Sequence, residues 1–184
     1  MNFRRIVKVS ICLAMLSVST GLWAQNESRW QNVDINQQNR EPRRASFFAY
    51  ESQDKAQGFD KKESANYLSM EGMWKFNFVK DHNKRPAKFF AVNYDDSKWK
   101  DFPVPGLFEL NGYGDATYKN VGYAWATQFA PNPPYISETN NYTGSYRRSF
   151  DLPTDWKGKD VYFHVGSATS NLTLWVNGKY VGYS

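Results

Sequence analysis

The chain has 184 residues, of which 41% are hydrophobic and 22% are charged, a balance that excludes a disordered polymer and indicates a globular protein. One cysteine and two histidines exclude a disulfide framework and a zinc cluster, and there is no second long apolar run as in a polytopic membrane protein. Without residues 1–24, which hold three basic residues and no acid, the net charge falls from +5 to +2, which gives no support to nucleic-acid binding.

Residues 1–24 predict a secretory signal peptide. Three basic residues precede a mostly apolar stretch from Val9 to Val18, and Ala24 offers a small residue for cleavage. This order is typical of exported proteins, and the stretch is too short to span a membrane. The alternative is a buried amphipathic start helix. We expect export to the periplasm or the medium, with Cys12 removed alongside the signal.

Residues 25–66 predict an extended arm that lies over a domain. The segment is polar, is interrupted by Pro42 and Gly58, and shows neither a helical nor a strand period. Its aromatic residues are the expected anchors, namely Trp30, Phe47, Phe48 and Tyr50.

The strand patterns begin at Met73, just after the turn signal of Gly72. Trp74, Phe76 and Phe78 alternate with Lys75 and Asn77, which predicts a half-buried strand. Residues 102–106 must be extended because their two prolines exclude helix from the preceding positions.

Later segments complete an all-β pattern. Alternating residues predict strands over 145–152, 161–165 and 172–176, whereas 106–141 is rich in Gly, Pro and Asn and predicts long loops. Asn177-Gly178 predicts a tight hairpin because both residues tolerate positive φ. The sum is an antiparallel β-sandwich. Since the chain ends early in the returning strand, we expect an N-terminal piece of a longer protein; a complete small domain with a short last strand is the alternative.

No catalytic constellation is visible in the spacing of the polar residues. Asp95-Asp96 is interpreted as a solvated loop, and no two acids are spaced as a predicted glycosidase pair. His82 lies in a polar run and is expected to be exposed, whereas His164 is expected to point away from the core. Neither histidine has a metal-ligand partner at short spacing.

Aromatic loops offer a better signal. Gly112-Tyr113-Gly114 and the segment 118–123 combine rings with amides. Aromatic faces pack against the C–H faces of sugars, and amides satisfy sugar hydroxyls. Two interpretations stay open at equal weight: these tyrosines contact a saccharide, or they close the end of the sandwich.

The ordered set of motifs resembles the N-terminal sugar-binding domain of glycoside hydrolase family 2, most closely that of large bacterial β-galactosidases. The resemblance runs from about Trp30 to Ser184. Its motifs are Trp30-Gln31-Asn32, Asn39-Arg40-Glu41-Pro42, residues 67–76, Trp99 with Val104-Pro105, Gly112-Tyr113, Tyr118-Lys119-Asn120 with Tyr123, Asn132-Pro133-Pro134, residues 144–150 and residues 175–184. The sequence departs from the family at Ala116 and at 124–127, where proline is common.

The resemblance implies a jelly-roll sandwich over 67–184, truncated at its C-terminus. It implies that Asn120 binds substrate by hydrogen-bonding the galactosyl unit, while two glutamates of a later barrel perform retaining hydrolysis. No catalytic residue, metal ligand or cofactor is expected in this chain, and Mg²⁺ and Na⁺ are implied for the full-length enzyme. The expected partners are a β-galactoside, the downstream domains and further copies of the enzyme, with no nucleic acid and no membrane.

Three functions therefore follow as hypotheses. The first is the N-terminal portion of an exported β-galactosidase, inactive alone. The second is a stand-alone, lectin-like carbohydrate-binding module, and the third is a structural domain that stabilises oligomers.

Overall fold

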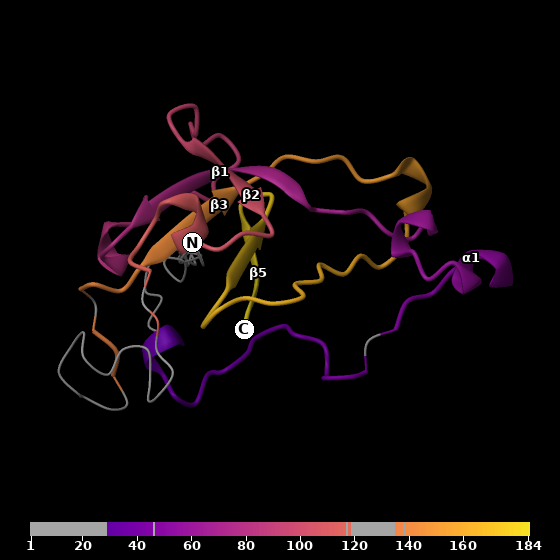
Figure 1. Cartoon of the computed structure of the whole chain (residues 1–184), viewed down its shortest axis with the longest axis horizontal. Helices are drawn as coiled ribbons and strands as arrows, with labels where there is room; N and C mark the ends of the chain where they lie inside the picture. Colours follow the sequence, from indigo (N-terminus) through magenta and orange to yellow (C-terminus); the bar gives the residue numbers. More distant parts are fainter. Residues whose placement is uncertain (1–28, 46, 117, 119–134, 138) are drawn as a thin grey trace, which may run out of the picture.

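The computed structural model describes residues 29–45, 47–116, 118, 135–137 and 139–184. Most of the regular structure in these ranges is strand (Figure 1). The strands are β1 (Gly72–Val79), β2 (Lys100–Val104), β3 (Thr143–Arg147), β4 (Thr173–Val176) and β5 (Lys179–Tyr183).

Helical structure is short throughout the described residues. The α-helix α1 covers Gln53–Gln57, and 3-10 turns lie at Arg29–Gln31, Lys61–Glu63, His82–Lys84, Glu109–Asn111 and Thr154–Trp156. No helix in the described ranges has both the length and the apolar character needed to cross a membrane. The predicted signal peptide lies outside these ranges.

The main sheet has three antiparallel strands in the order β2-β1-β3. The registers place Trp74 opposite Phe102 and Phe76 opposite Tyr146. The predicted alternation of β1 is therefore confirmed, and its aromatic face builds the core. Phe76 is 2% exposed, and its ring centroid lies 4.4 Å from that of Phe102 and 4.7 Å from that of Tyr146.

The second layer is the hairpin β4-β5, joined to the main sheet by residues 89–92. The Phe90 ring stacks on Trp175 of β4 at 5.2 Å. From the main sheet, the Arg147 guanidinium donates to the carbonyls of Phe89 and Ala91. Figure 1 shows the hairpin below β1 and β3. The expected fold class, an antiparallel sandwich of jelly-roll type, is confirmed.

The hairpin turn is the one predicted from the sequence. Asn177 and Gly178 have φ values of 50° and 77°, and Val176 pairs with Lys179 across them. Positive φ at both central positions is what a two-residue hairpin turn requires.

The arm adds a bridge to the edge of β5. Gln38 and Tyr183 exchange two backbone hydrogen bonds of 2.8 and 3.0 Å. The Asn39 amide also donates to the Val181 carbonyl at 2.8 Å. Residues 29–45 are thus fixed to the hairpin by an antiparallel contact.

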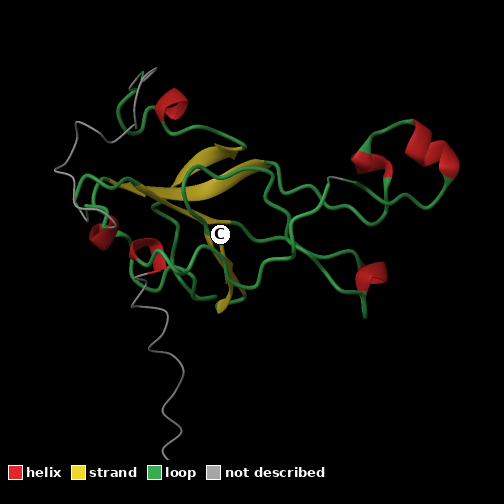
Figure 2. Cartoon of the chain, turned by 90° about the horizontal axis from the view of Figure 1, so that it is seen from below, coloured by secondary structure: helices red, strands yellow, loops and turns green. Residues whose placement is uncertain are grey.

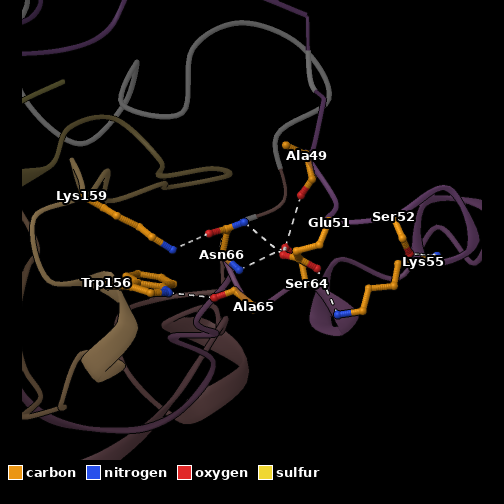
Figure 3. Close-up of polar contacts among 9 residues, drawn as sticks. All are labelled: Ala49, Glu51, Ser52, Lys55, Ser64, Ala65, Asn66, Trp156 and Lys159. Atoms are coloured by element: carbon orange, nitrogen blue, oxygen red, sulfur yellow. Dashed lines mark hydrogen bonds and ion pairs between the residues drawn. The ribbon is translucent and has the colours of Figure 1, made fainter.

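The rest of the arm forms one end of the elongated molecule. Figure 2 shows the strands gathered in the middle and helical segments projecting to one side, among them α1. Glu51 accepts hydrogen bonds from Ser64 and Asn66 (Figure 3). The Trp156 indole donates to the Ala65 carbonyl at 2.7 Å, so the arm and the turn at Thr154–Trp156 are held together.

Three expectations about secondary structure were wrong. The arm contains α1, a five-residue helix without an apolar stripe, whose start is capped by Ser52 accepting from the Lys55 amide. The strand predicted over 145–152 ends at Arg147, and residues 161–165 form no ladder. Tyr162 is 67% exposed. Alternation alone does not make a strand when no described segment pairs with it.

Candidate functional site

Asn120, the residue that the sequence predicts to contact a saccharide, lies outside the described residues. The structure does describe both flanks of its segment. We call these flanks the loop base, defined as 112–116, Tyr118, 135–137 and 139–142. The loop base follows the 3-10 turn Glu109–Asn111 and runs into β3 at Thr143.

Tyr113 of the loop base is part of the core. Its ring lies 4.9 Å from Phe76, 5.4 Å from Phe78 and 5.9 Å from Phe102. For this tyrosine, the interpretation that the ring closes the sandwich is confirmed. Tyr118 differs, because it is 87% exposed and leaves its ring accessible to a sugar face.

Tyr142 and Asp115 join the two flanks of the loop base. The Tyr142 ring packs at 5.4 Å on Phe78, and its hydroxyl donates to the Asp115 carboxylate across 27 residues of sequence. This hydrogen bond, followed by burial, raises the pKa of Tyr142. Gly114 gives the tyrosine room, since a Cβ there would lie 3.2 Å from the Tyr142 ring.

A second tie connects the loop base to the turn after β1. The Asn140 backbone amide donates to the Asp81 carboxylate at 3.0 Å. The Lys84 ammonium pairs with the same carboxylate at 2.8 Å. The bond from Lys84 and then that from Asn140 lower the pKa of Asp81. Asp81 therefore stays ionised and holds the chain just before β3.

His82 was expected to be exposed, but its side chain contacts two residues that are distant in the sequence. Its Nδ1 lies 3.1 Å from the Thr143 hydroxyl, and its ring centroid lies 4.9 Å from that of Trp30. The side chain is half-buried between the arm and the start of β3. The expected exposure failed because both partners are distant in sequence, whereas the expectation for His164, which is exposed, holds.

Asp95 and Asp96 have separate structural roles. Asp95 is exposed and accepts from the Ser97 amide at 3.0 Å, and that bond lowers its pKa. Asp96 was expected to be solvated, but it pairs with the half-buried Arg147 at 2.8 Å. This ion pair links the 89–99 segment to β3.

Sequence reasoning missed the side chain that reaches the loop base from the arm. The Gln31 amide donates to the Ile136 carbonyl at 2.6 Å and accepts from the Ile136 amide at 2.8 Å. The two residues are 105 positions apart, so no local pattern could reveal the pair. The one available signal was Gln31's place beside Trp30, an expected anchor.

The described residues do not form a metal centre. Nowhere in the described ranges do three or more His, Cys, Asp or Glu side chains gather where they could hold an ion. Asp81 and Asp115 each bind a neighbouring side chain of this chain instead. These residues do not fit the Mg²⁺ or Na⁺ implied for the full-length enzyme, and we assign them no metal-dependent step.

Comparison with known proteins gives the family. The model of the family described as "Glycosyl hydrolases family 2, sugar binding domain" matches residues 67–184. A β-galactosidase of Priestia megaterium is 33% identical over 162 residues, which cover 88% of this chain and 16% of the relative. A β-galactosidase of Halalkalibacterium halodurans is 33% identical over 161 residues, 86% of this chain and 16% of the relative.

A third relative agrees with these two. The β-galactosidase of Psychromonas ingrahamii is 34% identical over 155 residues, which cover 84% of this chain and 14% of the relative. The chain thus spans 14–16% of the length of these three relatives. On the family match over 67–184, this chain belongs to glycosyl hydrolase family 2 and carries its sugar-binding domain.

Proposed function

We propose that this chain is the N-terminal, non-catalytic portion of an exported β-galactosidase, which hydrolyses terminal β-galactosyl residues. The observation that carries the proposal is the match of most of the chain to part of relatives named β-galactosidase, 14–16% of their length. The reactive glutamates would belong to a downstream barrel. In this arrangement the loop base contributes to one wall of the saccharide pocket.

Recognition by such a wall needs an apolar face and amide groups. Tyr118 supplies an exposed ring that can pack on the C–H face of a galactosyl unit. Asn120 supplies both a donor and an acceptor for sugar hydroxyls. The ties from Tyr142 to Asp115 and from Asn140 to Asp81 hold the flanks, so these flanks need little ordering when a sugar binds.

The wider setting is part of the same proposal. Residues 1–24 direct export, residues 25–66 form the arm, and the full-length enzyme assembles as a homo-oligomer that uses Mg²⁺ and Na⁺ at sites beyond this chain. The partners of the chain are the β-galactoside and the downstream domains.

A nitrophenyl β-galactoside assay tests the proposal. The 184-residue chain should give no turnover above a blank, and the full-length product of its gene should hydrolyse the galactoside. The matching β-glucuronide and β-mannoside serve as controls and should react much more slowly. Turnover by the chain alone, or an inactive full-length product, contradicts the proposal.

The alternative is a stand-alone carbohydrate-binding module, which the exposed ring of Tyr118 favours. Calorimetry with methyl β-galactoside separates the two. Saturable binding by the 184-residue chain, together with cooperative unfolding and no hydrolytic full-length product, would support the module.

A further inference from the structure

We propose that Gln31 of the N-terminal arm is a positioning residue for saccharide binding, because it holds the flank of the loop base that leads into β3. This inference rests on the proposed function, since it assigns the loop base to a saccharide pocket. It assigns Gln31 no contact with the sugar.

The first observation is the geometry of the contact. The Gln31 side chain uses both its donor and its acceptor on the backbone of one residue, at 2.6 Å to the Ile136 carbonyl oxygen and 2.8 Å to the Ile136 amide nitrogen. An amide placed in this way pairs with the backbone as a neighbouring strand does. Two hydrogen bonds from one side chain fix the position and the orientation of residue 136.

The second observation is that this flank has little other support. The side chains of 135–137 make local contacts: the Ser137 hydroxyl donates to the Thr139 carbonyl at 2.9 Å and lies 3.2 Å from the Thr139 hydroxyl. Among the described residues, Gln31 supplies the only side chain from outside the loop base that hydrogen-bonds to 135–137. Tyr135 and Ile136 are exposed, at 60% and 39%, so burial holds them weakly.

The third observation is that the arm around Gln31 is itself anchored at two places. Trp30 packs on His82 at 4.9 Å, and His82 bonds to Thr143 at the start of β3. Arg29 donates to Gln38 at 2.8 Å and lies 4.5 Å from the centre of the Tyr180 ring.

Gln38 is paired with β5 through the backbone of Tyr183. Gln31 therefore projects from a fixed support rather than from a free tail. The arm thus connects the hairpin β4-β5, which it contacts at Gln38, to the flank of the loop base that it contacts at Gln31.

The test uses the full-length product of the gene with three variants. Gln31→Ala removes both hydrogen bonds. Gln31→Glu keeps the size of the side chain but replaces the donor to the Ile136 carbonyl with an oxygen. The control Gln37→Ala makes the same change at an exposed arm residue whose side chain has no hydrogen bond to the described residues of the loop base.

Two readouts are measured on each protein. Hydrogen exchange by mass spectrometry follows the backbone amides of 135–142, and nitrophenyl β-galactoside kinetics give KM and kcat. For Gln31→Ala we expect exchange about 5- to 10-fold faster and KM raised about 5- to 10-fold, since two hydrogen bonds of ordinary strength are lost. Gln31→Glu keeps an acceptor for the Ile136 amide but sets an oxygen against the Ile136 carbonyl, and it should change both quantities in the same direction. Thermal unfolding temperature and kcat should change little, and Gln37→Ala should match the wild type.

The outcomes separate the two proposals. Faster exchange with unchanged KM overturns the positioning role but leaves the proposed function standing. Unchanged exchange in Gln31→Ala overturns the tie itself. A loss of unfolding temperature that matches the loss of activity would show a merely structural role and would also overturn the inference. A wild-type full-length product that hydrolyses no β-galactoside overturns the proposed function, and the exchange data still decide whether Gln31 holds residue 136.

Discussion

Gly144 occupies a place in β3 where no side chain fits, and replacing it with alanine should destabilise the fold. A Cβ at this position would lie 2.7 Å from Phe108 Cζ and 2.7 Å from Phe76 Cε2. Optimal carbon–carbon contact is at about 3.5–4.0 Å, so both rings would have to move. The φ of Gly144 is not in the left-handed region, and lack of space is therefore the reason for glycine here.

The rings cannot move freely. Phe76 is 2% exposed and is in ring contact with Phe102, Tyr113 and Tyr146 at 4.4–4.9 Å. Overpacking of a filled core costs about 1–3 kcal/mol, and Gly→Ala returns about 0.4–1 kcal/mol by restricting the unfolded chain. We expect Gly144→Ala to lower the free energy of unfolding by about 1–2 kcal/mol.

Gly166→Ala is the matched control. An added Cβ at Gly166 meets no atom within 4 Å, and its φ is not left-handed, so the change should be neutral or stabilise by up to about 1 kcal/mol. Urea unfolding followed by tryptophan fluorescence measures both variants, and with m of about 1–3 kcal/mol/M the midpoints should differ by roughly 1 M. Equal midpoints for the two variants would refute the packing around Gly144.

Other predictions concern charges and buried rings. Hydrogen bonds from Ser64 and then Lys55 lower the pKa of Glu51 to about 2. The contribution of Glu51 to the free energy of unfolding is therefore complete above pH 4.5 and is lost as pH falls toward 2. Glu51→Gln should remove that part of the acid unfolding profile. Burial raises the pKa of Tyr146 to about 12. The contribution of Tyr146 to the free energy of unfolding is complete below pH 10 and is lost as pH rises toward 12. In Tyr146→Phe the free energy of unfolding should change less with pH across this range. Arg147→Lys removes the forked contacts and should cost about 1–3 kcal/mol in urea unfolding. An unchanged midpoint would show that the fork of hydrogen bonds from Arg147 adds nothing to stability beyond its charge.

The local features of the fold could be predicted from the sequence. Asn177-Gly178 sets its own backbone angles, and the alternation of Trp74, Phe76 and Phe78 marks a buried face whatever its partners are. The same reasoning failed for 161–165, because its alternation looks like that of β1 and only pairing separates the two. The helix α1 gave no signal, since four polar residues, one alanine and a serine cap carry no apolar period.

The candidate site depends on contacts that no local pattern records. Asp115 and Tyr142 are 27 residues apart, and Gln31 and Ile136 are 105 apart. His82 looked like part of a solvated run because Trp30 and Thr143 come from elsewhere in the chain. The role of Asn120 came from resemblance to a family, and it stays a prediction because this residue lies outside the described part of the structure.

The most direct test of the central proposal is the effect of Asn120→Ala on kcat/KM for a nitrophenyl β-galactoside, measured on the full-length product of the gene. Loss of a hydrogen bond to the sugar, with its partner left unsatisfied, should lower kcat/KM about 10-fold or more. The control Asn93→Ala, at an exposed asparagine of the 89–99 segment, should leave kcat/KM unchanged. An Asn120→Ala enzyme as active as the wild type would contradict the claim that this chain supplies a wall of the saccharide pocket.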